Sequence, residues 1–161
     1  MAEFRRPHHR RIAAILAAMD PRFLASAGCY FGGGTQIALA LDEYRESRDI
    51  DFLCANGAGF RKLRESVTEN SLGLAFRRAP KLAREVRADR DGIRTFIASG
   101  DVRIKFEIVL EARIELAGAV DRKLGVPALD LDHMVAEKLL ANADRGLDAS
   151  TGSRDAIDLS F

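Results

Sequence analysis

The chain contains 161 residues, of which 47% are hydrophobic and 30% charged, and its 25 basic and 24 acidic residues leave a formal net charge of +1. This length is enough for one hydrophobic core and too short for two, so we expect a single domain over residues 1–161. No apolar run approaches the about 20 residues that a membrane-spanning helix needs, and we expect no membrane partner. The two cysteines have neither metal nor redox spacing, so we expect both thiols to be buried. The segment 10–29 resembles an export signal, but Asp20-Pro21-Arg22 breaks its short apolar run, so we expect a helix and a strand of a cytoplasmic protein.

Helical and extended patterns alternate in the first third of the chain. Residues 1–9 show no apolar pattern, and we expect them to form a loose arm. Apolar side chains at helical spacing predict a helix over Arg10–Met19. A first strand is expected over Ala25–Phe31, a short helix over Gln36–Leu41, and a second strand over Ser47–Leu53.

A β-hairpin is the clearest pattern in the rest of the chain. The segments Ile93–Ala98 and Val102–Leu110 flank a Ser-Gly-Asp turn, and alternate residues of the second segment are apolar. We expect a further edge strand over Ala112–Ala117 and a helix over Asp132–Ala143, with the first residue of that helix as its N-cap. A final helix is expected to open at Ser153. Together these elements predict an α+β fold in which helices pack on a mixed, partly antiparallel sheet.

Three successive glycines, Gly32, Gly33 and Gly34, stand between the first expected strand and the short helix. Glycine lets the backbone approach a bulky anion and adopt dihedral angles that are closed to other residues. Thr35 follows at the expected N-cap position, and the free N–H groups at the start of a helix suit a phosphate. Taken alone, however, such a run is more often only a flexible turn.

Two aspartates, Asp49 and Asp51, follow in the chain, with thirteen residues between Thr35 and Asp49. Residues i and i+2 of a strand point to the same side, so the two carboxylates share one face. They repel each other unless a hard cation lies between them, and Mg²⁺ prefers such oxygen ligands while leaving positions open for phosphate oxygens. The acid pair alone also fits a solvated strand end. The pair and the glycine turn together predict a nucleoside triphosphate held through metal ions.

Glu107 lies on the polar side of the predicted strand Val102–Leu110, together with Arg103 and Lys105. A carboxylate in a buried strand is unfavourable unless its charge is used or paired. Glu107 is therefore a candidate third metal ligand, provided that its strand lies beside the strand of the two aspartates. Glu111 has the same parity and is the reserve candidate. The alternative is a salt bridge from Glu107 to Lys105 or Arg103.

The segments GGGT and RESRDIDFL resemble the signature of the nucleotidyltransferases of the DNA polymerase β superfamily. Within it the chain is most similar to the AbiEii/AbiGii-type toxin nucleotidyltransferases, which carry a GGT turn and an R-x-S-x-D-I-D segment. Arg45, Ser47, Asp49 and Asp51 fill those positions. Relatives usually continue with more helix beyond the point that matches Phe161. From this we expect either a fragment or an unusually small C-terminal helical part.

The resemblance implies a minimal nucleotidyltransferase fold and a set of catalytic residues. It implies that two Mg²⁺ (or Mn²⁺) ions are held by three carboxylates, and that further roles fall to a lysine in AEKLLA and an aspartate in RDAIDL. That aspartate would position the acceptor or hold the lysine. The catalytic set is Asp49, Asp51, Glu107, Lys138 and Asp155. From the residues alone, Lys138 also fits a surface lysine, and Asp155 also fits the start of a helix.

The resemblance also implies how the nucleotide is bound. Gly33, Gly34 and Thr35 would cradle the β- and γ-phosphates of the NTP, while Ser47 would orient the aspartates or contact a phosphate. Lys138 would neutralise the charge that develops as pyrophosphate leaves.

The predicted activity is transfer of a nucleoside monophosphate from an NTP to an acceptor hydroxyl. The relatives suggest a toxin of a toxin–antitoxin pair, with RNA, such as a tRNA end, as acceptor and a cognate antitoxin protein as partner; this step rests on analogy. One alternative is a nucleotidyltransferase that acts on a small molecule such as an antibiotic or metabolite. Others are a truncated, inactive module that binds a nucleotide or a partner protein, and a plain RNA-binding domain.

Overall fold

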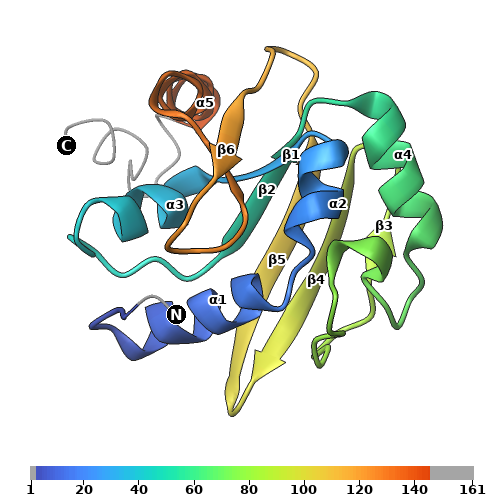
Figure 1. Ribbon diagram of the computed structural model, residues 1–161, viewed down its shortest axis with the longest axis horizontal. Helices are drawn as coiled ribbons and strands as arrows, with labels where there is room; N and C mark the ends of the chain where they lie inside the picture. The colour runs from blue at the N-terminus through green and yellow to red at the C-terminus, as the bar shows by residue number, and fades with distance from the viewer. Residues whose placement is uncertain (1–2, 146–161) are drawn as a thin grey trace.

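The computed structural model describes residues 3–145, with side chains described as far as residue 140. In this part of the chain a mixed sheet has the strand order β3-β4-β5-β2-β1-β7-β6, with helices packed against it (Figure 1). The strands are β1 (Cys29–Gly32), β2 (Ile50–Cys54), β3 (Arg87–Ala88), β4 (Gly92–Ser99), β5 (Val102–Leu110), β6 (Gly118–Val120) and β7 (Pro127–Leu129). The helices are α1 (Pro7–Ala17), α2 (Pro21–Ser26), α3 (Gly33–Ala40), α4 (Gly57–Ser66) and α5 (Leu131–Arg145), with a short 3-10 turn η1 (Gly73–Ala75).

The three central strands bring the glycine turn and the acidic residues together. Strand β2 pairs with β1 in the antiparallel sense and with β5 in the parallel sense. In these registers Asp51 has Gly32 as its partner on one side and Glu107 on the other. Neighbouring strands lie about 4.8 Å apart. Gly32, Asp51 and Glu107 therefore form one row across the middle of the sheet.

The alternation of side chains along β2 and β5 decides which face of the sheet carries the core. On this face alternate residues of both strands are fully buried, namely Ile50, Phe52 and Cys54 on β2 and Ile104, Phe106 and Ile108 on β5. Aromatic rings follow one another across it with centroid separations of 5.6, 6.2 and 5.7 Å. The rings belong to Phe31, Phe52, Phe106 and Phe76. The predicted hairpin and its apolar face are thus confirmed. Cys29 and Cys54, which are register partners, are free and fully buried, as expected.

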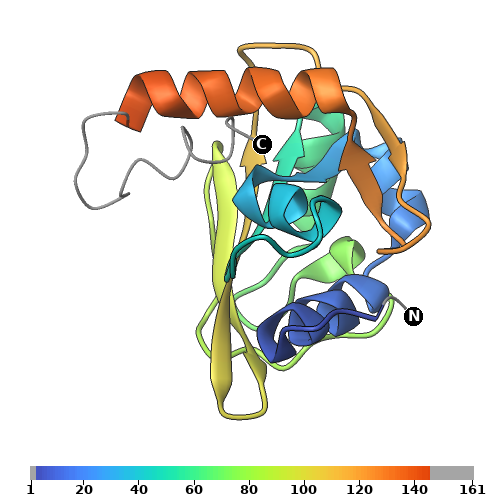
Figure 2. The ribbon, with the colours of Figure 1, turned by 90° about the vertical axis from the view of Figure 1, so that its left-hand side faces the viewer.

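Helix α5 covers part of the opposite face, to which the acidic residues belong. A hydrogen bond joins the Glu137 side chain on α5 to Glu111, the residue that follows β5, and the charge of Lys138 on α5 acts on Asp51. Figure 2 shows α5 crossing above the upper ends of the central strands, while α1 lies at the other end of the molecule. Helices α3 and α5 contact each other.

The start of the chain differs from the loose arm expected for residues 1–9. Helix α1 begins at Pro7, and proline is well suited to the first turn because its missing N–H has no intrahelical partner there. Phe4 is 4% exposed, and His9 is fully buried. The polar run of histidines and arginines carries no apolar periodicity, so the sequence did not indicate that this segment packs against the sheet domain.

Helix α2 explains why the first strand is shorter than expected. The side chain of Asp20 accepts hydrogen bonds from the N–H groups of Arg22 and Phe23, both at 3.0 Å, and so caps a helix that begins at Pro21. This helix includes the residues Ala25 and Ser26 that the sequence pattern assigned to a strand. Strand β1 therefore begins only at Cys29.

Two expectations near the C-terminal helix were wrong. Residues 112–117 form no strand, whereas Pro127–Leu129 forms β7, parallel to β1. Asp130, not Asp132, caps α5, because its Oδ1 accepts the N–H of His133 at 3.0 Å. Strand β7 is buried and only three residues long, so it has no alternating pattern that would indicate a strand.

Candidate active site

Asp49 and Asp51 lie where the chain enters β2, with Asp51 inside the strand and Asp49 just before it. The strand is shorter at its start than the predicted Ser47–Leu53, because residues 46–49 adopt no regular structure. Glu107 is the register partner of Asp51 on β5. The structure therefore brings together the three carboxylates that the sequence singled out, although they come from distant parts of the chain.

The electrostatics of Asp51 reflect this crowding. The pKa of its carboxyl is raised from 3.8 to about 6, first because burial disfavours the charged form and then because Glu107 and Asp49 repel it. The ammonium groups of Lys105 and Lys138 act in the opposite direction. Asp51 is thus a carboxylate whose ionised state needs additional positive charge.

Glu107 is bonded to cations of its own sheet. Its Oε1 lies 2.9 Å from Lys105 Nζ and 3.8 Å from Arg94 Nε. This is the salt bridge considered from the sequence, made with Lys105 and not with Arg103. The sequence indicated the Lys105 contact because Lys105 and Glu107 lie on the same side of one strand. It did not indicate the Arg94 contact, because the register of the hairpin was unknown.

The site chemistry fits a hard cation, but its side chains are not preassembled around one. Among residues 3–140, no group of three or more His, Cys, Asp or Glu side chains is arranged to hold a metal ion. The carboxylates repel each other, which raises the Asp51 pKa, and a Mg²⁺ ion would offset this repulsion. The residues offer only oxygen donors, which Mg²⁺ prefers. Asp49 and Asp51 would supply the first ligands, and Glu107 would have to exchange Lys105 for the cation.

The glycine turn directly contacts Asp51. Gly33 has φ of +74°, and a Cβ atom added to it would lie 3.0 Å from Asp51 Oδ2. Helix α3 begins at this residue, with Gly32 as an N-cap that offers no side-chain hydrogen bond. The first N–H groups of a helix have no intrahelical acceptor. Their positive end therefore opens beside the acidic row, an arrangement suited to a phosphate group.

The hydroxyl groups of Thr35 and Ser47 bond to each other inside the protein. Thr35 is not the N-cap of α3 but lies inside the helix, 1% exposed, and its hydroxyl donates to the carbonyl oxygen of Asp49. Since a hydroxyl has one proton, Ser47 Oγ must donate to Thr35 Oγ1, 2.7 Å away. Both hydroxyl protons are used inside the protein, so only backbone N–H groups of this turn face a nucleotide.

Lys138 is 7% exposed and lies on α5, where its charge lowers the pKa of Asp51. A surface lysine, the alternative considered from the sequence, is therefore not what the structure shows. Asp155, the remaining residue of the predicted site, lies outside the described residues.

A hollow of about 550 Å³ borders Asp49 on the side of the β4–β5 hairpin. Arg11, Arg48, Arg103 and Lys105 contribute its cations, and Phe96 an aromatic ring over which the Arg103 guanidinium lies at 5.6 Å. Three acids, Asp49 among them, also border it. The hollow therefore meets the acidic site at Asp49.

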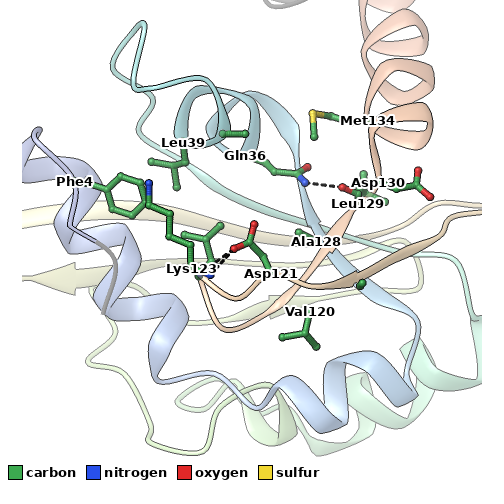
Figure 3. Close-up of a pocket in the computed structure, with 13 residues that line it drawn as sticks. Phe4, Gln36, Leu39, Val120, Asp121, Lys123, Ala128, Leu129, Asp130 and Met134 are labelled. Carbon is green, nitrogen blue, oxygen red and sulfur yellow. Dashed lines mark hydrogen bonds between the residues drawn. The ribbon is translucent and has the colours of Figure 1, made fainter.

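A second hollow, of about 540 Å³, lies beside α3 and is lined by none of the three carboxylates (Figure 3). Phe4, Leu39 and Leu129 line it, and Gln36 donates to the carbonyl oxygen of Leu129 at 2.9 Å. Lys123 places its ammonium 4.4 Å from the centre of the Phe4 ring. This hollow is separate from the candidate active site.

Comparison with known proteins identifies the class of the protein. The α+β fold, with an acid pair beside a glycine turn, is that of the nucleotidyltransferases. More particularly, the chain belongs to the family described as nucleotidyl transferase AbiEii toxin, type IV TA system, whose model matches residues 14–161. No curated protein matches the chain. Within the described residues, no helix is both long and apolar enough to cross a bilayer.

Solved structures with a similar arrangement include two proteins of Helicobacter pylori and one of Thermotoga maritima. A candidate nucleotidyltransferase of H. pylori is 18% identical with a TM-score of 0.48, over 82% of this chain and 56% of that one. The H. pylori protein JHP933 is 17% identical with a TM-score of 0.47, over 82% and 54%. A candidate nucleotidyltransferase of T. maritima is 14% identical with a TM-score of 0.47, over 94% of both chains. The chain thus spans little more than half of the two H. pylori proteins.

Proposed function

We propose that this chain transfers a nucleoside monophosphate from an NTP to an acceptor hydroxyl at the site formed by Asp49, Asp51 and Glu107. The contact between Gly33 and the Asp51 carboxylate supports the proposal, because a helix start is suited to a phosphate and the adjacent acid pair is suited to a hard cation. In the reaction the acceptor oxygen forms a bond to the α-phosphorus. The bond from that phosphorus to the bridging oxygen breaks, and pyrophosphate leaves with both electrons.

Residues of the chain would bind the metal ions, bind the phosphates and accept the proton of the acceptor. Asp49, Asp51 and Glu107 would hold two Mg²⁺ or Mn²⁺ ions, which supply charge neutralisation at the phosphate oxygens when bound. The N–H groups of Gly33, Gly34 and Thr35 would bind the β- and γ-phosphates. A Glu107 oxygen released from Lys105 would accept the proton of the acceptor hydroxyl.

Two further residues are assigned to the leaving pyrophosphate and to the acceptor. Lys138 would stabilise the negative charge that develops on pyrophosphate, since its ammonium already acts on the Asp51 charge. Asp155, by family resemblance, would position the acceptor or hold Lys138. Ser47 orients the acid segment through Thr35.

The acceptor we propose is RNA, such as the end of a tRNA, modified in the cytoplasm by a toxin that a cognate antitoxin protein restrains. The family description supports the toxin and antitoxin part of the proposal. The cation-lined hollow beside Asp49 supports a polyanionic acceptor. A phosphate backbone lying there would bring a terminal hydroxyl toward the acidic row.

The test is incubation of the protein with each labelled NTP, Mg²⁺ and total cellular RNA. Label should enter RNA with release of pyrophosphate, and Asp49→Asn and Asp51→Asn should each abolish transfer while the protein stays folded. Asp91→Asn, which removes an exposed carboxylate at the β3–β4 turn, is the matched control and should transfer normally. Full turnover in Asp51→Asn would refute the proposal.

The same assay separates the alternatives. Label that enters a small cationic acceptor but no RNA would favour a small-molecule enzyme. Calorimetric binding of NTP with Mg²⁺ and no labelled product would favour an inactive module. Binding of RNA without metal or NTP, with a steep salt dependence, would favour a plain RNA-binding domain.

A further inference from the structure

His9 on α1 is fully buried and makes two hydrogen bonds to the segment that leads into β2. Its Nδ1 lies 2.8 Å from Glu43 Oε1, and its Nε2 accepts the backbone N–H of Ser47 at 3.0 Å. Neither residue belongs to the acidic row. Both bonds connect the N-terminal helix to the stretch of chain immediately before Asp49.

These partners determine the tautomer of the imidazole. The Ser47 N–H is a donor, so Nε2 must present its lone pair, and the ring proton lies on Nδ1. Glu43 accepts that proton as an ionised carboxylate. Its pKa is lowered to about 2 because, against the effect of burial, it also accepts the N–H groups of Arg6 and Arg5. His9 is therefore a neutral imidazole that bridges a carboxylate and a backbone amide.

The bridge reaches Asp49 through two hydroxyl groups. Ser47, whose N–H is held by His9, donates its own hydroxyl to Thr35, and Thr35 donates to the carbonyl oxygen of Asp49. The direction of this chain is fixed by the one proton on each hydroxyl. His9, Ser47 and Thr35 thus anchor the backbone of Asp49 to both α1 and α3.

The segment that is anchored has no regular structure of its own. Residues 41–49 form turns and bends without helix or strand, and Asp42 and Glu43 have φ of +54° and +55°. Non-glycine residues adopt such angles only when the surroundings hold them there. The hydrogen bonds to Glu43 and Ser47 are therefore what defines where the chain enters β2.

We propose that His9 is a positioning residue for the acid pair, acting through Ser47 and Thr35 to fix Asp49 beside the start of α3. This inference rests on the proposed nucleotidyl transfer, because the position of Asp49 matters for turnover only if Asp49 holds the metal ion. His9 itself touches neither substrate nor metal.

Two substitutions separate the two hydrogen bonds of the ring. In His9→Asn the amide nitrogen occupies the place of Nδ1 and keeps the bond to Glu43, but nothing reaches Ser47. In His9→Gln the longer side chain places an amide oxygen where Nε2 was, so the Ser47 N–H keeps its acceptor. We expect kcat to fall about tenfold in His9→Asn, with KM for NTP little changed, and to be largely restored in His9→Gln. Equal kcat in the two variants would overturn the proposal.

A readout independent of activity comes from amide hydrogen exchange and ¹⁵N spectra of the metal-free protein. Nε2 of His9 should be unprotonated, and the Ser47 amide should be protected in the wild type and His9→Gln but not in His9→Asn. A protonated Nε2, or equal Ser47 protection in the two variants, would overturn the proposal even if the protein transfers no nucleotide. Conversely, the expected exchange pattern without any transfer would leave the positioning intact and reject the proposed function.

Thr35→Val keeps the test decisive if His9→Asn fails to fold. Valine has the shape of threonine but cannot donate to the Asp49 carbonyl. It should lower kcat as His9→Asn does while leaving the Ser47 amide protected, because the imidazole still accepts that N–H. Undiminished kcat in a folded Thr35→Val protein would overturn the proposed chain.

Discussion

Gly33 and Asp51 contact each other so closely that a side chain at position 33 would push the Asp51 side chain aside by a few tenths of an ångström. The Cβ of any other residue at position 33 would lie 3.0 Å from Asp51 Oδ2 and 3.3 Å from Asp51 Cβ, and φ of +74° is itself unfavourable for a residue with a side chain. The start of α3 and the acid pair are thus one structural unit. A change on one side of this contact has to displace the other.

Gly33→Ala is therefore expected to affect both stability and nucleotide binding. The left-handed backbone angle should cost about 1–2 kcal/mol in the free energy of unfolding. Displacement of the Asp51 carboxylate should additionally weaken Mg²⁺-dependent NTP binding, measured by calorimetry. Gly125→Ala is the matched control: Gly125 has φ of +75°, but an added Cβ would have no neighbour within 4 Å. It should lose similar stability and bind NTP normally, and equal NTP affinity in both variants would contradict the assigned contact.

The raised pKa of Asp51 predicts how stability depends on pH in the metal-free protein. The folded state keeps a proton on Asp51 up to pH about 6, whereas the unfolded chain loses it near 3.8. Folding thus takes up a proton in this window, and the free energy of unfolding should fall as the pH rises from about 4 to about 6, on the order of 2 kcal/mol. Asp51→Asn should remove this dependence.

Urea denaturation in EDTA at several pH values measures the effect. At pH 8 Asp51→Asn should be more stable than the wild type, and at pH 3.5 the two should agree. The exposed Asp91→Asn should behave as the wild type at both pH values. An Asp51→Asn protein that is less stable than the wild type at pH 8 would show that the crowding of carboxylates is not costly in the folded state.

Lys138→Met tests the cation that α5 places over the acidic row. Methionine retains the apolar stem of the buried lysine but lacks the ammonium, so packing should change little. The pKa of Asp51 should rise above about 6, because the charge of Lys138 lowers it. Turnover should fall roughly 100-fold, the usual effect of removing one group that stabilises developing charge. Leu139→Met, at a 56% exposed neighbour, should leave kcat unchanged; normal turnover in Lys138→Met would assign the lysine a purely structural role.

The sequence predicted the parts of the fold that local patterns encode. In the β4–β5 hairpin, β5 alternates apolar and polar side chains after a glycine turn, so the hairpin, its buried side and the polar position of Glu107 followed directly. The spacing of the glycines and the aspartates predicted that the glycine turn lies beside the acid pair. A short connection between a helix and the next strand allows few arrangements of these two segments.

Other features depend on tertiary contacts that no local pattern contains. Thr35 matched an N-cap by its position after three glycines, but the helix already begins at Gly33, and the threonine hydroxyl reaches Asp49 from inside the helix. His9 belongs to a polar run with the appearance of an arm, and its burial follows from Glu43 and Ser47, more than thirty residues away. The short strand β7 exists because β1 offers it a parallel edge.

Arg103 provides the test of the acceptor surface. Its guanidinium borders the hollow beside Asp49 and lies over the Phe96 ring, where it would contact a phosphate backbone or a stacked base. Arg103→Gln should weaken RNA binding, with the slope of log affinity against log salt reduced by about 1 for one lost phosphate contact. NTP binding should be unchanged, since Arg103 is not part of the glycine turn or the acidic row. Arg90→Gln removes an 88% exposed arginine outside the hollow and should alter neither property. If both variants lowered the salt slope equally, the attraction would come from the general charge of the surface, and the hollow would lose its role as the path of the acceptor.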